Sequence, residues 1–158
     1  MIMRNFVKQT HIRLLKSNRT IATAESCTAG LLSSLLTQFS GSSKYFILGV
    51  ATYSNQAKKA ILGIPVSVIR KNGAVSKETA LSMAQNVRKL AKTDFGVSIT
   101  GIAGPEGGSP QKPVGTVFIA ISAKHGNTCK KFLLEGNRSK VRNQAALKAL
   151  QLINKMAK

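Results

Sequence analysis

The chain contains 158 residues, of which 43% are hydrophobic and none is tryptophan. That length and apolar content exclude a disordered chain and predict a single domain over residues 1–158 with a core of its own. The 24 Lys and Arg residues outnumber the 5 Asp and Glu residues, and the resulting net charge of +19 favours anionic partners.

Membrane proteins and metal sites are disfavoured by what the sequence lacks. No apolar run approaches the length of a membrane span, and the first residues carry charge too early for a secretory signal. We therefore expect a cytoplasmic protein. Cys27 and Cys129 lie far apart, which argues against a disulfide framework or a zinc motif. No carboxylates or histidines stand at metal-ligand spacing, so we expect no metal site.

The first half of the chain alternates between helical and strand-like patterns. We expect a helix over 5–17, a strand over 20–26, a helix from about Ala29 with Leu32, Leu35, Leu36 and Phe39 on its apolar face, a strand over 46–53, and a helix from Ser54 or Asn55 to Gly63.

The second half continues this alternation and adds a hairpin. We expect a short helix ending near Gly73, a helix behind Ser76, strands over 94–101, 114–122 and 128–136 with a hairpin turn at 125–127, and a last helix from Arg138. Such an order predicts a three-layer α/β/α sandwich with a mixed, mostly parallel sheet. Because ligands lie beyond the carboxyl ends of the strands in such sheets, Ser26, Tyr53 and Thr100 become candidates to line one crevice.

The stretch "TAESCTAG", residues 23–30, places three nucleophile-capable side chains at a strand-to-helix junction. Free amides at the helix start could stabilise an oxyanion while the Ser26 hydroxyl attacks a carbonyl. This stretch alone favours a Ser or Thr cap of the helix over a nucleophile. Cys27 is the alternative nucleophile, but with no histidine nearby we favour a small buried hydrophobe.

The stretch "TYSNQAKK", residues 52–59, offers a candidate base. Lys58 falls in the first turn of a helix, where the dipole and neighbouring cations lower the pKa of its amine. Such a lysine can take a proton from a serine hydroxyl. Lys59 points to another face, and spacing alone favours an ordinary surface cation for either lysine.

Two further stretches could bind an anion. Four glycines within 101–108 would let backbone amides approach an anion or a carbonyl oxygen, although a mobile surface loop explains them equally well. Arg138 and Arg142 stand at i, i+4 on the last helix, where they could hold a phosphate or form a solvated stripe.

Several stretches, taken together and in order, resemble the CinA C-terminal domain family, the nicotinamide-nucleotide amidohydrolases. They are "TAESCTAG", "GSSKYF", "VATYSNQAK", "GAVS", "SITGIAGPEGGS", "KPVGTVFIA" and "GNRSKVRNQA", and they cover nearly the whole chain. The chain is similar to the stand-alone, PncC-like form of the family. One departure is Ala29, where the family often has glycine.

The resemblance implies hydrolysis of the carboxamide of nicotinamide mononucleotide to nicotinate mononucleotide and ammonia, without a metal or organic cofactor. The family's proposed serine and lysine fall on Ser26 and Lys58, with Tyr53 as a further candidate to return a proton. We expect the substrate to be bound by residues of the same motifs and, from their charge, by the two arginines: Cys27, Thr28, Gly30, Ser54, Asn55, Thr100, Gly101, Ala103, Gly104, Arg138 and Arg142.

The expected partner is thus a small phosphorylated molecule. We also expect a homo-oligomer, with a dimer as a candidate state. The charge motivates a second hypothesis, a basic nucleic-acid-binding module, although the cations are spread along the chain and few aromatic residues are interleaved for base stacking. A third hypothesis is a catalytically silent family member that binds nucleotide.

Overall fold

A computed structural model of the chain describes residues 2–157, and its five strands form one sheet in the order β2-β1-β3-β4-β5. β1 pairs in parallel with β2 and β3, whereas β4 is antiparallel to β3 and β5. Four strands therefore run in one direction and β4 runs against them, which confirms the mixed sheet. β4 and β5 form the predicted hairpin, with Ala123 paired to Gly126. The strands are β1 (Ile21–Glu25), β2 (Phe46–Ala51), β3 (Phe95–Gly101), β4 (Thr116–Ala123) and β5 (Gly126–Leu133).

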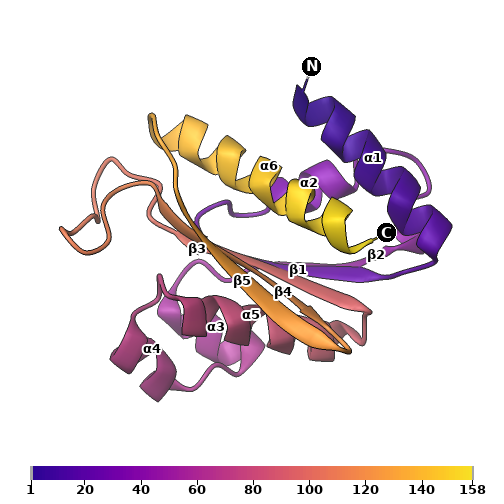
Figure 1. Cartoon of the computed structure of the whole chain (residues 1–158). Helices are drawn as coiled ribbons and strands as arrows, with labels where there is room; N and C mark the ends of the chain where they lie inside the picture. Colours follow the sequence, from indigo (N-terminus) through magenta and orange to yellow (C-terminus); the bar gives the residue numbers. More distant parts are fainter. Residues whose placement is uncertain (1, 158) are drawn as a thin grey trace.

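Helices cover both faces of this sheet and complete the predicted three layers. In Figure 1, α1, α2 and α6 lie on one face, and α3, α4 and α5 lie on the other. The helices are α1 (Ile2–Ser17), α2 (Leu31–Leu36), α3 (Asn55–Leu62), α4 (Val66–Asn72), α5 (Lys77–Ala91) and α6 (Arg138–Met156), with a short 3-10 helix, η1 (Ser42–Lys44), before β2.

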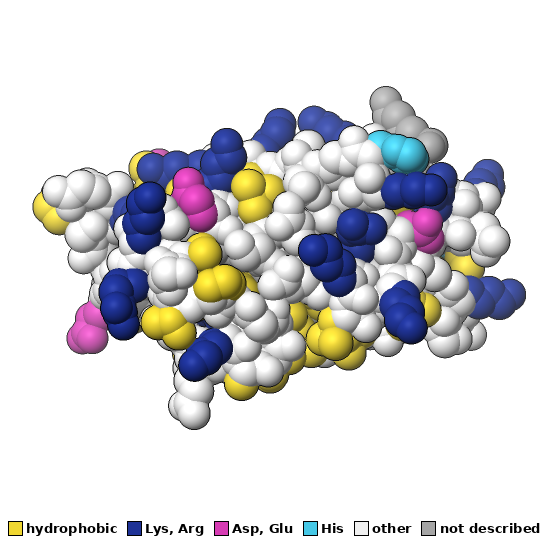
Figure 2. Space-filling model, turned by 90° about the horizontal axis from the view of Figure 1, so that it is seen from below, with side chains coloured by type: hydrophobic (Ala, Val, Ile, Leu, Met, Phe, Trp, Pro, Cys, Tyr) yellow, Lys and Arg dark blue, Asp and Glu magenta, His cyan; other side chains and the backbone are white. Residues whose placement is uncertain are grey.

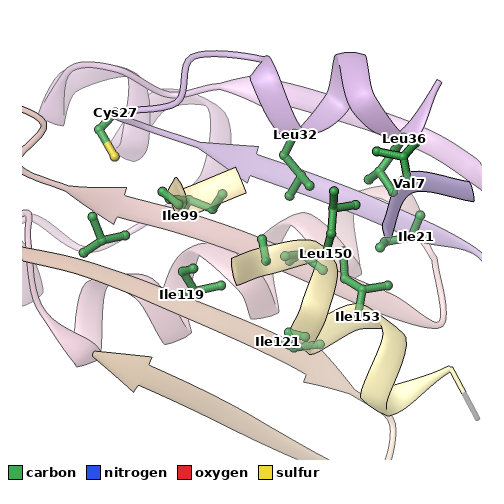
Figure 3. Packing of buried hydrophobic residues seen from close by; sticks show 14 of the residues in the cluster. Val7, Ile21, Cys27, Leu32, Leu36, Ile99, Ile119, Ile121, Leu150 and Ile153 are labelled. Atoms are coloured by element: carbon green, nitrogen blue, oxygen red, sulfur yellow. The ribbon is translucent and has the colours of Figure 1, made fainter. Parts of the chain in front are cut away.

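The hydrophobic core is divided by the sheet into two parts. On the α6 side, Leu150 and Ile153 pack toward Ile119 and Ile121 of β4, as Figure 3 shows. On the α5 side, a separate cluster includes Met83 and Val87. Every residue of β1 is buried, because helices cover this central strand on both faces.

Two helix starts confirm the caps expected from the sequence. The Ser54 hydroxyl accepts a hydrogen bond from the Ala57 amide at the start of α3, and the Ser76 hydroxyl accepts one from the Thr79 amide at the start of α5. α6 begins at Arg138, as predicted. These caps satisfy amides that have no partner within the first turn.

The helix after β1 differs from its prediction. α2 is only six residues long, and the Thr37 hydroxyl hydrogen-bonds back to the Ser33 and Ser34 carbonyls where the helix ends. Phe39 lies beyond the helix, although it still packs against the core. The N-cap residue is Gly30, which has a left-handed φ of 95° and no capping side chain.

Basic side chains are distributed over the surface. In Figure 2, which shows the α3–α5 side of the molecule, Lys and Arg are scattered and do not form one patch. Within residues 2–157, the single ion pair joins Arg19 to Asp94 at 2.9 Å. No helix in this part of the chain is long and apolar enough to cross a membrane.

Gly96 allows α5 to lie directly on β3, so we predict that Gly96→Ala destabilises the fold. An added Cβ would lie 2.6 Å from the Arg88 Cβ and would also collide with the Ala84 carbonyl oxygen. Overpacking of this kind costs about 3 kcal/mol, which urea denaturation would measure. Lys89→Ala, on an exposed part of the same helix, is the control and should change stability by less than about 0.5 kcal/mol. Equal denaturation midpoints for the two variants would contradict the prediction.

Candidate active site

A cavity of about 280 Å³ lies where the carboxyl ends of β1 and β3 meet the segment that follows β2. Ten of the residues predicted from the sequence line it: Ser26, Cys27, Tyr53, Asn55, Lys58, Thr100, Gly101, Ala103, Gly104 and Arg138. Thr28, Gly30, Ser54 and Arg142 are not among the residues that line it.

A serine and a lysine form a buried pair in this cavity. The Lys58 Nζ lies 3.0 Å from the Ser26 Oγ, and the two side chains come from segments 32 residues apart. The same nitrogen donates to the carbonyl oxygens of Thr52, at 2.9 Å, and Tyr53, at 3.3 Å. As an ammonium group Lys58 donates to all three of these oxygen atoms. A neutral amine has two N–H donors and one lone pair, so with both donors on the carbonyls the lone pair of neutral Lys58 would face the Ser26 hydroxyl.

Burial distinguishes Lys58 from its neighbour. Lys58 is 1% exposed although it stands in the first turn of a surface helix, and desolvation lowers the pKa of its amine. The interpretation that spacing favoured, an ordinary surface cation, is therefore wrong for Lys58. It is correct for Lys59, which is exposed to solvent. The side chain of Lys58 is buried because it reaches back past the start of α3 to the end of β1.

Cys27 follows Ser26 and has the properties of a buried thiol. Its side chain is 6% exposed and belongs to the core cluster on the α6 side, at whose margin Figure 3 shows it. Burial raises the pKa of this thiol to about 11. The nucleophilic thiolate is consequently a minor form near neutral pH, in agreement with the expectation of a small buried hydrophobe.

Glu25 is a residue of the site region that the sequence interpretation did not assign. It is the last residue of β1 and is fully buried, and its carboxylate accepts hydrogen bonds from the amides of Gly30, Leu32 and Ser33. The expected Ser or Thr cap of α2 is therefore wrong, because the cap comes from this acid five residues before Gly30. The signal in the sequence was an acidic residue shortly before a helix start.

The two arginines of α6 have different surroundings. Arg138 lines the cavity, where its guanidinium donates to the Gly104 carbonyl oxygen and to the Tyr53 hydroxyl, each at 2.8 Å. Arg142 instead donates to the Thr28 carbonyl oxygen at 2.9 Å. The i, i+4 pair therefore does not act as one anion site, and Arg138 is the member placed to meet a ligand.

Thr100 links two of the segments that border the cavity. Its hydroxyl donates to the Ala74 carbonyl oxygen at 2.8 Å, and the side chain is almost fully buried. This bond joins the end of β3 to the segment before α5. The sequence interpretation missed four lining residues that carry no local signal or lie between assigned ones, Ala74, Val75, Ile102 and Glu106, whereas Gly107 belongs to the glycine loop that it considered.

The cavity is lined by the Lys58 amine and the Arg138 guanidinium, whose N–H groups suit an anionic or carbonyl-containing ligand. Within residues 2–157 no group of three or more His, Cys, Asp or Glu residues could hold a metal ion.

The fold and the site together define an α/β protein with a buried serine–lysine pair at the carboxyl end of its sheet. The family model described as the CinA C-terminal domain matches residues 4–157. The chain belongs to this family, which confirms the resemblance drawn from its motifs.

Relatives and solved structures agree with this membership. CinA-like proteins from Kosmotoga olearia and Geobacter metallireducens are 48% and 44% identical over 90% and 94% of this chain. The chain spans about a third of their length, 34% and 36% respectively. The crystal structure of the competence/damage inducible protein CihA from Agrobacterium tumefaciens matches with a TM-score of 0.96 and 33% identity, over 100% of this chain and 97% of that one. A CinA superfamily protein from Escherichia coli matches with a TM-score of 0.91 and 33% identity, over 96% and 89% of the two chains.

The lowered pKa of Lys58 predicts a pH-dependent contribution to stability. Between the folded pKa and about 10.5, the unfolded chain binds more protons at this residue than the folded chain does. The contribution of Lys58 to the free energy of unfolding therefore rises with pH across that window, by up to about 1.4 kcal/mol per pH unit. Below the folded pKa this contribution is constant at its lowest value.

The test compares the free energy of unfolding of the wild type and Lys58→Met at several pH values from 6 upward. We expect the wild type to gain stability relative to the variant as the pH approaches about 10.5. Lys59→Met, which changes an exposed neighbour on the same helix, is the control. A constant difference for Lys58→Met would show that its amine titrates as it does in solvent.

Proposed function

We propose that this protein is an amidohydrolase that converts nicotinamide mononucleotide to nicotinate mononucleotide and ammonia through an acyl-enzyme. The observation that carries the proposal is the 3.0 Å contact between the Lys58 amine and the Ser26 hydroxyl inside the cavity. Buried lysines with a lowered pKa can activate a neighbouring hydroxyl as a nucleophile. Family membership supports the choice of substrate, because the resemblance to this family implies hydrolysis of the carboxamide of nicotinamide mononucleotide.

In the first step, neutral Lys58 takes the proton of Ser26 while the serine oxygen attacks the carboxamide carbon. The carbonyls of Thr52 and Tyr53 hold the two N–H groups of the amine and so orient its lone pair. When the proton has been transferred, the resulting ammonium ion can donate to all three oxygen atoms. The site thus stabilises the charged form as the reaction produces it.

Backbone amides are available for the developing oxyanion. The amide of Ser26 is already bonded to the Ile99 carbonyl, and the amide of Ala29 to the Ser26 carbonyl. Among the described residues, the amides of Cys27 and Thr28 form no backbone–backbone hydrogen bond. The Cys27 amide, next to the nucleophile, is our first candidate for an oxyanion donor, with the glycine loop as the second.

Collapse of the tetrahedral intermediate breaks the bond between carbon and nitrogen. The departing nitrogen takes the proton of Lys58, either directly or by way of the Tyr53 hydroxyl, which Lys58 then reprotonates, and leaves as ammonia. A water molecule then gives a proton to neutral Lys58 and attacks the acyl carbon. Release of the carboxylic acid returns the proton to Ser26, so that one amide and one water yield one acid and one ammonia.

Arg138 is the residue we assign to the 5′-phosphate. It lines the cavity, and its guanidinium already bonds two oxygen atoms at the rim, the Gly104 carbonyl and the Tyr53 hydroxyl. A phosphate can replace these neutral acceptors with stronger, charge-assisted hydrogen bonds. Arg142, which bonds the Thr28 carbonyl, is assigned a structural role instead.

The direct test is ammonia release from nicotinamide mononucleotide by the wild type, Ser26→Ala, Lys58→Ala and Cys27→Ala. We expect Ser26→Ala and Lys58→Ala each to lower kcat/KM by about 10³-fold or more, because removing either the nucleophile or its base disables the same chemical step. Cys27→Ala should retain activity within about tenfold of the wild type, since its thiol stays protonated. Nicotinamide riboside and nicotinamide serve as substrates without the phosphate.

Four outcomes would overturn or redirect the proposal. Full activity in Ser26→Ala excludes the serine mechanism, and selective loss in Cys27→Ala with an intact fold transfers the role to the thiol. Stabilisation of the wild type by the nucleotide without turnover would favour a silent nucleotide-binding protein. Binding of generic DNA or RNA that weakens steeply with salt, without turnover, would favour the nucleic-acid module suggested by the charge of +19.

The proposed base also predicts the pH profile of the reaction. Since only neutral Lys58 can accept the serine proton, kcat/KM should rise with pH and level off above the pKa of this amine in the free enzyme. That pKa is lowered by burial, so the plateau begins below the 10.5 of an ordinary lysine. A profile that is flat from pH 6 to 10 in a chemistry-limited assay would exclude Lys58 as the base.

A further inference from the structure

Glu25 binds the start of α2 with both oxygen atoms of its carboxylate. Its Oε2 accepts from the Gly30 amide at 3.1 Å and the Leu32 amide at 3.0 Å. Its Oε1 accepts from the Ser33 amide at 2.8 Å and the Ser33 hydroxyl at 2.7 Å. Within residues 2–157 this carboxylate forms no ion pair, so its buried charge is balanced by four hydrogen-bond donors.

The hydrogen-bond donors around Glu25 match the acceptors that a carboxylate offers. The Thr23 hydroxyl lies 2.8 Å from the Ser33 hydroxyl, which in turn donates to Glu25. Thr23 can therefore donate to Ser33 and complete a chain of hydroxyls that ends on the carboxylate. Gly49 of the neighbouring strand leaves room for this chain, since a Cβ there would lie 2.6 Å from the Ser33 Oγ.

This cap closes the short segment that carries the nucleophile. Residues 26–29 lie between Glu25 and the amides that its carboxylate binds. Inside the segment, the Ala29 amide donates to the Ser26 carbonyl at 3.1 Å, and the Leu31 amide donates to the Thr28 carbonyl at 3.2 Å. From the other side, Arg142 of α6 donates to that same Thr28 carbonyl.

The cap also decides which amides remain for a ligand. Gly30, Leu32 and Ser33 would be the first donors at a free helix start, but Glu25 occupies all three. The amides of Cys27 and Thr28 form no backbone–backbone hydrogen bond, and of these two residues Cys27 lines the cavity. The Cys27 amide, next to the serine, is therefore the one in this segment that is placed to meet a negative charge in the cavity.

We propose that Glu25 is a positioning residue for the Ser26–Lys58 pair, holding the segment so that the Ser26 Oγ stays within hydrogen-bond distance of the Lys58 Nζ and the Cys27 amide stays available to a ligand. This inference rests on the proposed amidohydrolase function. Glu25 does not touch the substrate. It acts through the backbone of the segment, and its loss should therefore lower kcat more than it raises KM.

The central variant is Glu25→Gln, which keeps the shape of the side chain but places an amide N–H₂ where one oxygen accepted hydrogen bonds. We expect kcat for nicotinamide mononucleotide to fall by about 10- to 100-fold, with KM changed by less than about threefold. Ser33→Ala removes one of the four donors and leaves the carboxylate, so we expect a smaller loss of about three- to tenfold. Ser33→Ala keeps the test decisive if Glu25→Gln does not fold.

Tyr45→Phe is the matched control at the opposite end of the same helix. The Tyr45 hydroxyl donates to the Leu36 carbonyl at the end of α2 and is fully buried, so its loss should lower Tm without moving the nucleophile. We expect kcat within about twofold of the wild type for this variant. If Glu25→Gln and Ser33→Ala lose no more kcat than Tyr45→Phe at a similar loss of Tm, Glu25 is only a structural cap and the inference is wrong.

A second readout separates this inference from the proposed substrate. A fluorophosphonate probe reacts with an activated serine by forming a bond between Oγ and phosphorus and releasing fluoride, while the serine proton passes to Lys58. We expect the wild type to be labelled at Ser26, detected by mass spectrometry, and Glu25→Gln to be labelled about 10-fold more slowly. Labelling without ammonia release would overturn only the substrate assignment, whereas absence of both would overturn the serine mechanism and this inference with it. Equal labelling rates in wild type and Glu25→Gln would overturn the positioning role alone.

Discussion

The contact between the Lys58 amine and the Ser26 hydroxyl is the interaction on which the rest of the site depends. An amine that is 1% exposed has lost nearly all of its hydration, and the carbonyls of Thr52 and Tyr53 restore only part of it. Such a group stays in place only where the surrounding segments are rigid. The parallel pairing of β1 with β2 and β3 provides this rigidity, because it holds together the segments that follow these three strands at the carboxyl end of the sheet.

Burial separates the roles of the two cationic residues in the cavity. Lys58 is buried, which favours its neutral form and makes it suitable as a base. Arg138 is exposed at the rim, where its guanidinium can hold an anion through paired hydrogen bonds. The remaining positive charge is scattered over the surface, where its combined field favours the approach of any anionic ligand (Figure 2).

Much of the fold could be predicted because its signals are local. The apolar stripe of α5, the caps at Ser54 and Ser76 and the start of α6 at Arg138 each depend on residues within a few turns of one another. α2 was not predicted correctly because its stability comes from elsewhere. Glu25 of the preceding strand satisfies its first amides, so a six-residue helix persists without a Ser or Thr cap.

The sequence by itself determined the layer architecture, the candidate nucleophile and base, and the family, because periodicity, caps and ordered motifs are read along the chain. Only the tertiary structure decided that Lys58 is buried against Ser26, that Arg138 and not Arg142 lines the cavity, and that Glu25 occupies the helix amides. Burial and hydrogen bonding between distant segments depend on strand order and on how the helices pack, and no local pattern specifies these in advance.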